Sequence, residues 1–181
     1  MTVPSELKTI RDMLRLAVTE LSKAGVSFGH GTNNPLDEAV SLISYCLNLT
    51  SEIFEQFLDS ALTKSEKKTI CDVLEKRIQQ RKPLPYLTNE AWLCDYKFYV
   101  DERAIIPRSY IAELITQSLS PWIVEPKKIN NILDLCTGSG CLGIIAAHIF
   151  ENATVDASDL SPEALEVAKI NIADFKLNKR V

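Results

Sequence analysis

The chain has 181 residues, of which 46% are hydrophobic and 24% are charged, and its formal net charge is −4. This composition is typical of a soluble globular protein and excludes a wholly disordered chain. The slight acidity argues against a wide nucleic-acid interface, because phosphate binding needs a basic face. No apolar run approaches the roughly 18 residues of a membrane span, and the N-terminal sequence lacks the pattern of a secretory signal. We therefore expect a cytoplasmic protein that binds neither a membrane nor nucleic acid directly.

The five cysteines are scattered along the chain, and the two histidines have no neighbours at metal-ligand spacing. A disulfide framework and a zinc site are therefore not expected, and no metal ligand is predicted. A reducing compartment is the simpler setting for these thiols.

The N-terminal part of the chain has the periodicity of helices. Apolar residues recur every three or four positions over residues 10–21, and Gly25 is expected to end that helix. Asn34 precedes a proline and two acidic residues, which predicts the start of a second helix. Thr63 begins a capping box ahead of a third helix. The sequence therefore predicts an N-terminal helical domain over residues 1–88.

A connecting segment separates this domain from the rest of the chain. Residues 82–85 contain two prolines and are expected to break the helical pattern. Two short strands that flank residues 95–96 predict a β-hairpin connector over residues 89–108. A third extended piece is expected at residues 105–107, and a helix over residues 113–122.

From Ile129 onward the pattern alternates between strands and helices. Strands are predicted at residues 132–136 and 154–157, with a glycine turn and a helix over residues 141–150 between them. Pro162 lies at the first position of a further helix. This order is the start of a doubly wound α/β sheet, so the expected fold class is a helical domain followed by an α/β domain.

The glycine turn and two acidic residues have the pattern of a binding site. Gly138 and Gly140 lie where a buried strand leads into a helix, and the N–H groups of that helix start can face a carboxylate or a phosphate. Asp134, near the end of the strand, can hold an ammonium group. Asp159 follows the second strand, where an acid can bind both hydroxyls of a ribose. An ammonium group, a carboxylate and a ribose together describe S-adenosylmethionine.

Two alternatives stay open at this point. Residues 138–143 also match the Gly-x-Gly-x-x-Gly pattern of dinucleotide sites, which would suit an oxidoreductase that uses NAD. Asp134 favours the methyl donor, because a carboxylate inside the strand would repel a pyrophosphate. The second alternative is a helical module that binds a protein without catalysis.

Several segments resemble a known enzyme family. Residues 134–140 resemble the first motif of class I methyltransferases, and residues 106–108 resemble a segment of the protein N(5)-glutamine methyltransferases, which modify release factors and ribosomal proteins. Residues 28–39, 86–89 and 98–103 resemble the branch of this family that acts on the third protein of the large ribosomal subunit. The resemblance covers nearly the whole chain.

The resemblance implies a reaction and a set of site residues. Methyl would pass from S-adenosylmethionine to a glutamine side-chain amide of a large-subunit ribosomal protein. The helical domain would recognise that substrate, and residues 109–181 would form an incomplete class I, Rossmann-like methyltransferase domain. The residues implied at the cofactor site are Asp134, Cys136, Thr137, Gly138, Ser139, Gly140, Asp159 and Leu160. Arg108 and Glu113 are implied at the substrate site.

The chain departs from the family pattern in three places. Cys136 replaces the first glycine of the usual loop, and the residues that follow Arg108 differ from those of the release-factor branch. The Asn-Pro-Pro-Tyr loop, which orients the glutamine amide in this family, is absent from the chain, so no catalytic residue is assigned. We therefore expect the N-terminal portion of a longer enzyme that is inactive alone. Because flanking strands would be missing, we expect partial exposure of Ile144, Ile145, Leu165 and Ile172.

Overall fold

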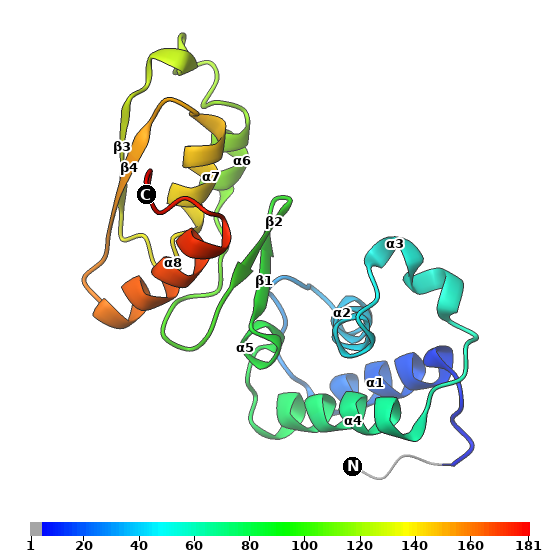
Figure 1. The fold of residues 1–181 in the computed structure, drawn as a ribbon. Coiled ribbons are helices and arrows are strands. Elements are labelled where there is room, and N and C mark those ends of the chain that lie inside the picture. Colours follow the sequence, from blue (N-terminus) through cyan, green and yellow to red (C-terminus); the bar gives the residue numbers. More distant parts are fainter. Residues whose placement is uncertain (1–4) are drawn as a thin grey trace. The chain divides into compact units, whose positions relative to one another are not determined.

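The computed structural model describes residues 5–181, with Ser51 described by its backbone only. The order of its elements can be followed in Figure 1. Contacts between Cα atoms divide the chain into a helical unit that ends at Thr88 and a mixed unit from Asn89 to Val181. No helix of the described residues is both long enough and apolar enough to cross a membrane.

The described part of the helical unit contains six helical elements, of which α1, α2 and α4 begin at a side-chain cap. They are α1 (Ile10–Ala24), α2 (Pro35–Leu47), α3 (Ser51–Phe54), η1 (Glu55–Phe57), α4 (Lys64–Gln79) and α5 (Leu84–Thr88). The side chain of Asn34 accepts a hydrogen bond from a backbone N–H of α2, Thr63 forms the predicted capping box of α4, and Gly25 ends α1 at φ 57°. The predicted helical break holds only up to Leu84, because α5 begins there. Pro85 is compatible with a first helical turn, whose N–H groups have no partner within the helix.

The core of the helical unit lies between α1, α2 and α4. Met13, Leu42 and Leu74 are fully buried there, one from each helix. Burial of each such side chain contributes about 1.5–3 kcal/mol. The apolar periodicity of the sequence therefore corresponds to one shared interior.

A buried ion pair holds the loop that precedes α2. The Nε of Arg77 donates to Oε1 of Glu38 over 2.7 Å, and both side chains are less than 5% exposed. Arg77 also donates to the carbonyl of Ser27, and the hydroxyl of Thr32 donates to Glu38. The segment over residues 28–39 is thus fixed to α4 by charged hydrogen bonds inside the unit.

The mixed unit combines a hairpin with a parallel strand pair. Its elements are β1 (Glu90–Leu93), β2 (Tyr96–Tyr99), α6 (Tyr110–Thr116), η2 (Pro126–Lys128), β3 (Asn131–Leu135), α7 (Cys141–Ile149), β4 (Thr154–Ser158) and α8 (Pro162–Asp174). β1 and β2 pair antiparallel, which confirms the predicted hairpin. β3 and β4 pair parallel, with Leu135 opposite Ser158. This strand–helix–strand unit confirms the predicted start of a Rossmann-like sheet.

One predicted element between the hairpin and β3 has the wrong bounds. Residues 105–107, predicted as an extended piece, lie outside the helices and the paired strands. The helix expected over residues 113–122 begins earlier, at Tyr110, where Ser109 caps it. It also ends earlier, because Ser118 and Leu119 adopt left-handed backbone conformations with φ of 57° and 53°.

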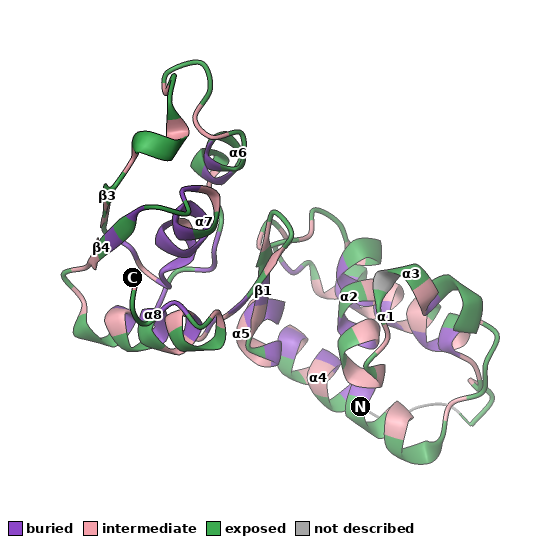
Figure 2. Cartoon of the chain, turned by 45° about the horizontal axis from the view of Figure 1, so that its top comes forward, coloured by how far each residue is buried: buried purple, intermediate pink, exposed green. Residues whose placement is uncertain are grey.

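α7 lies in the core of the mixed unit, and Figure 2 shows it mostly buried. Ile144 and Ile145 are fully buried, so their predicted partial exposure is wrong; Leu165 and Ile172 are half-buried. The covering residues come from the hairpin and α6, which place Phe98 and Ile115 in the same core. Exposed apolar side chains lie instead on β3, where Leu133 and Leu135 alternate with inward-facing residues.

Candidate functional site

The glycine loop, defined here as residues 136–140, joins β3 to α7. Cys136, Gly138 and Gly140 all have left-handed backbone conformations, with φ of 61°, 57° and 80°. Such conformations suit glycine and cost a residue with a Cβ roughly 1–2 kcal/mol. The backbone N–H of Thr137 donates to the carbonyl of Ser158 over 2.9 Å, which extends the β3–β4 pairing into the loop.

Asp134 turns its carboxylate toward the start of α7. Its Oδ2 accepts hydrogen bonds from the backbone N–H of Gly143, over 2.9 Å, and from the hydroxyl of Thr137. Its Oδ1 has no hydrogen-bond partner among the described residues. The carboxylate therefore stabilises the helix start through Oδ2, and its Oδ1 is available to a cation.

Asp159 reaches the glycine loop from the end of β4. Its Oδ2 accepts from the N–H of Gly138 over 2.8 Å, and its Oδ1 accepts from the N–H of Ser161 over 2.9 Å. These backbone donors, Ser161 first and Gly138 second, lower the pKa of Asp159 below its ordinary value. The side chain is thus a carboxylate at neutral pH, and its neighbour Leu160 is 98% exposed.

The helix start behind the loop is closely packed. Ser139 and Gly140 are buried, and a Cβ on Gly140 would lie 3.2 Å from the Cβ of Ala168 in α8. Glycine is therefore required at position 140 both by φ and by the approach of α8. The first N–H groups of α7 have no partner within the helix. That of Gly143 donates to Asp134 of β3.

The two residues predicted at a substrate site are not drawn into this cluster. Arg108 is exposed and precedes α6, and Glu113 is exposed in the first turn of α6. Neither side chain hydrogen-bonds to a described residue of the glycine loop. Ile105, by contrast, lies beside the loop, with its Cγ2 3.8 Å from the position of a Cβ on Gly138.

A buried polar residue beside the glycine loop was not predicted from the sequence. Asn171 of α8 is 1% exposed and donates through its Nδ2 to the carbonyl of Ser139 over 2.8 Å. The available signal was a polar residue in the apolar stripe of α8, in register with Ala164, Val167 and Ala168.

The polar groups around the glycine loop fit S-adenosylmethionine, the methyl donor inferred from the sequence. The parallel pairing of β3 and β4 brings Asp134, the glycine loop and Asp159 to the carboxyl ends of both strands, where open α/β sheets bind ligands. Two acids and a helix start can hold an ammonium group, a ribose and a carboxylate. Among residues 5–181, no three His, Cys, Asp or Glu side chains are grouped so that they could hold a metal ion.

Comparison with known proteins shows which proteins the chain is similar to. Residues 114–181 match the model of the methyltransferase small domain. The chain is 48% identical over 180 residues to the ribosomal protein uL3 glutamine methyltransferase of Burkholderia pseudomallei, 50% identical over 176 residues to that of Neisseria gonorrhoeae, and 47% identical over 176 residues to that of Bordetella pertussis. These matches cover 97–99% of the chain, and the chain spans 59% of the length of each relative. The predicted resemblance is thereby confirmed: residues 114–181 match the methyltransferase small domain, and nearly the whole chain is similar to proteins named ribosomal protein uL3 glutamine methyltransferases.

Proposed function

We propose that the complete protein transfers a methyl group from S-adenosylmethionine to a glutamine side-chain amide of ribosomal protein uL3. The observation that carries this proposal is the cluster of Asp134, the glycine loop and Asp159 at the ends of β3 and β4. It occurs in a chain that is 47–50% identical to proteins of that name. Because the chain spans 59% of their length, the activity is proposed for the complete protein.

The donor would be held by residues that the structure has already oriented. Asp159 would accept hydrogen bonds from the ribose hydroxyls, and the free Oδ1 of Asp134 would face the ammonium group. The loop N–H groups would face the carboxylate of the methionine part. Leu160 offers an exposed apolar side chain to the base. Cys136, Thr137, Gly138, Ser139 and Gly140 complete this proposed cofactor site.

The cofactor would supply the electrophilic methyl group when it is bound. The chain's own residues would hold the donor and fix its orientation, which is a contribution of positioning. We assign none of the described residues as a catalytic base.

Each of the two structural units would have its own role. Residues 1–88 would recognise the ribosomal protein, residues 89–108 would form a β-hairpin connector, and residues 109–181 would bind the donor. Arg108 and Glu113, both exposed, remain the proposed substrate contacts on the donor-binding side. The net charge of −4 supports a protein partner rather than nucleic acid, and a ribosomal substrate supports a cytoplasmic location.

Calorimetric titration of the complete protein with S-adenosylmethionine and with NAD tests the donor. Binding of S-adenosylmethionine without binding of NAD supports the proposal, whereas the reverse supports the dinucleotide alternative.

Transfer of labelled methyl to purified uL3 tests the reaction, with uL3 glutamine variants as controls. A complete protein that binds the donor but labels no ribosomal protein would leave the substrate assignment wrong. If residues 1–88 retained uL3 in a pull-down while the complete protein bound no donor, the helical module without catalysis would be the better description.

A further inference from the structure

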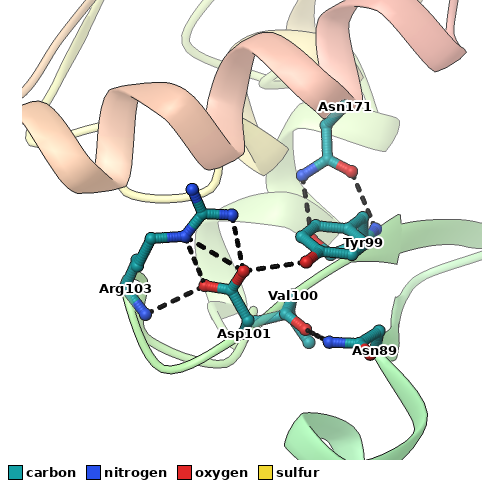
Figure 3. Close-up of polar contacts among 6 residues, drawn as sticks. All are labelled: Asn89, Tyr99, Val100, Asp101, Arg103 and Asn171. Atoms are coloured by element: carbon teal, nitrogen blue, oxygen red, sulfur yellow. Dashed lines mark hydrogen bonds and ion pairs between the residues drawn. The ribbon is translucent and has the colours of Figure 1, made fainter.

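Asn171 is a buried amide whose hydrogens are both used within the mixed unit. Its Nδ2 donates to the carbonyl of Ser139 over 2.8 Å and to the carbonyl of Tyr99 over 3.0 Å. Its Oδ1 accepts from the backbone N–H of Tyr99 over 2.7 Å. Figure 3 shows the amide reaching from α8 to both backbone groups of Tyr99. One side chain therefore ties the last residue of β2 to the glycine loop.

The segment that follows β2, here called the arch, comprises residues 100–107 and is itself fixed. The side chain of Asn89 donates to the carbonyl of Val100 over 3.1 Å. Asp101 accepts from the hydroxyl of Tyr99 over 2.8 Å and forms an ion pair with Arg103 at 2.6 Å (Figure 3). The arch therefore leaves β2 in one defined direction.

The arch returns to the glycine loop after it has packed on α8. Ala104 is buried against Ala164 and Val167 of that helix. The next residue, Ile105, lies beside Gly138. α8 meets the loop itself through Ala168, against Gly140, one helical turn before Asn171. The loop is thus held between α8 and the arch, and Asn171 hydrogen-bonds both to the loop, at Ser139, and to Tyr99, the residue from which the arch begins.

We propose that Asn171 is a positioning residue for the methyl donor, which fixes the glycine loop relative to the arch without contact with the ligand. This inference rests on the proposed donor site. The loop binds through backbone N–H groups, and their directions depend on where the carbonyl of Ser139 is held. Loss of both Nδ2 hydrogens removes the donor from the buried carbonyl of Ser139 and from the part-buried carbonyl of Tyr99. An unpaired buried carbonyl is costly, so we expect the loop to shift until Ser139 finds another partner.

The decisive variant is Asn171→Asp, which has almost the same shape as the native residue. Its ionised carboxylate can accept from Tyr99 but would face two carbonyl oxygens, whereas its protonated form can donate to one of them again. Burial and these carbonyls raise the pKa of such a carboxyl, so the hydrogen bond can be restored by acid. Asn152→Ala is the matched control, because that exposed amide also donates to a carbonyl, that of Lys127, over 3.0 Å.

We expect Asn171→Asp in the complete protein to bind S-adenosylmethionine about tenfold more weakly than the wild type at pH 8, as the loss of hydrogen bonds predicts. At pH 5.5 this ratio should fall, whereas Asn152→Ala should match the wild type at both pH values. The wild type, titrated at each pH, accounts for the ionisation of the ligand's own ammonium group. Equal affinity of Asn171→Asp and wild type at pH 8 would overturn the proposal. So would a loss that does not change with pH, since that would indicate a general loss of structure.

Amide hydrogen exchange without ligand separates this inference from the proposed function. Asn171→Asp should exchange faster than the wild type at residues 138–143, and both should exchange alike at residues 144–149. If the wild type binds no S-adenosylmethionine, the proposed function fails and this exchange pattern alone decides whether Asn171 positions the loop.

If Asn171→Asp does not fold, Asn171→Ser takes its place, because one hydroxyl cannot donate to both carbonyls. Wild-type affinity and wild-type exchange in Asn171→Ser would then overturn the proposal.

Discussion

The backbone N–H of Gly143 donates to Oδ2 of Asp134 over 2.9 Å, and a Cβ on Gly143 would lie 3.0 Å from that same oxygen. The carboxylate therefore occupies space that only glycine leaves open in the first turn of α7. A charge-assisted hydrogen bond from a helix N-terminus is among the stronger polar contacts in a protein. The last glycine of the Gly-x-Gly-x-x-Gly pattern thus fixes an acid of the site.

Gly143→Ala is expected to destabilise the mixed unit by about 1 kcal/mol. Alanine in place of glycine stabilises a helix interior by up to about 1 kcal/mol. Displacement of the Asp134 carboxylate, however, breaks its hydrogen bond with the N–H of residue 143, which is worth about 1.5–3 kcal/mol. Urea unfolding followed by tryptophan fluorescence measures the difference, because both tryptophans, Trp92 and Trp122, lie in this unit. In an Asp134→Asn background the penalty should shrink. A Gly143→Ala protein as stable as the wild type would contradict this account.

Asp159→Ala is expected to weaken donor binding about tenfold or more, because it removes charge-assisted hydrogen bonds of roughly 1.5–3 kcal/mol. The fold should persist, since the residue lies at the end of β4 and is partly exposed. Calorimetry with S-adenosylmethionine gives the affinity. Asp156→Ala, which removes an exposed acid of the same strand, should bind the donor like the wild type. Unchanged affinity in Asp159→Ala would exclude the ribose assignment.

The stability that Asp159 contributes should depend on pH. Hydrogen bonds from Ser161 and Gly138 lower the pKa of Asp159 in the folded protein, so the unfolded chain binds its proton first as the pH falls. The contribution is then full above the ordinary aspartate pKa of about 3.9 and is lost as the pH falls through the lower folded value. The urea midpoints of wild type and Asp159→Asn should differ equally at pH 7 and 6 and converge below about pH 4. A difference that persisted at pH 2 would rule out this carboxylate as the source.

Arg77→Met is expected to destabilise the helical unit by about 3–5 kcal/mol, because it leaves Glu38 buried without its partner. Circular dichroism should show an earlier helical transition, while tryptophan fluorescence, which reports the other unit, should change little. Arg11→Ala is the matched control. It breaks an ion pair with Asp59 whose side chains are 59% and 81% exposed, so its effect should be far smaller than that of Arg77→Met. Equal effects of both variants would show that burial does not set the contribution of the Arg77 pair.

Exchange of residues 1–88 for the corresponding domain of a release-factor methyltransferase is expected to weaken methylation of uL3. The physical reason is that the proposed donor site would bind a cofactor that is the same for every protein substrate. Rates of labelled methyl transfer to uL3 and to a release factor measure the change. Undiminished activity on uL3 would place recognition outside the helical unit.

Helix starts were the most predictable part of the fold. Asn34, Thr63 and Ser161 each accept a hydrogen bond from a backbone N–H three residues ahead, so the signal is contained in a short stretch of sequence. The end of α6 was not predictable in this way. It is decided by left-handed conformations at Ser118 and Leu119, neither of which is a residue that favours them.

The proposed donor site likewise has a part that the sequence predicts and a part that it does not. Asp134, the glycine loop and Asp159 could be placed together because a parallel strand–helix–strand unit always brings the carboxyl ends of its strands to one edge. The role of Asn171 could not be read from helical periodicity, because the backbone groups that satisfy its amide belong to other elements. Only the three-dimensional arrangement shows why a polar residue is tolerated in that apolar stripe.

The bonds of Asn171 also bear on the order in which the site is completed during synthesis. The ribosome adds Asn171 to the chain 72 residues after Tyr99 and 32 residues after Ser139. A growing chain therefore holds β3, the glycine loop and α7 before it holds the side chain that fixes the loop. At about 5–20 residues per second, that interval lasts on the order of a few seconds. We expect a nascent chain that ends before α8 to have every loop residue and still lack a loop of the final shape.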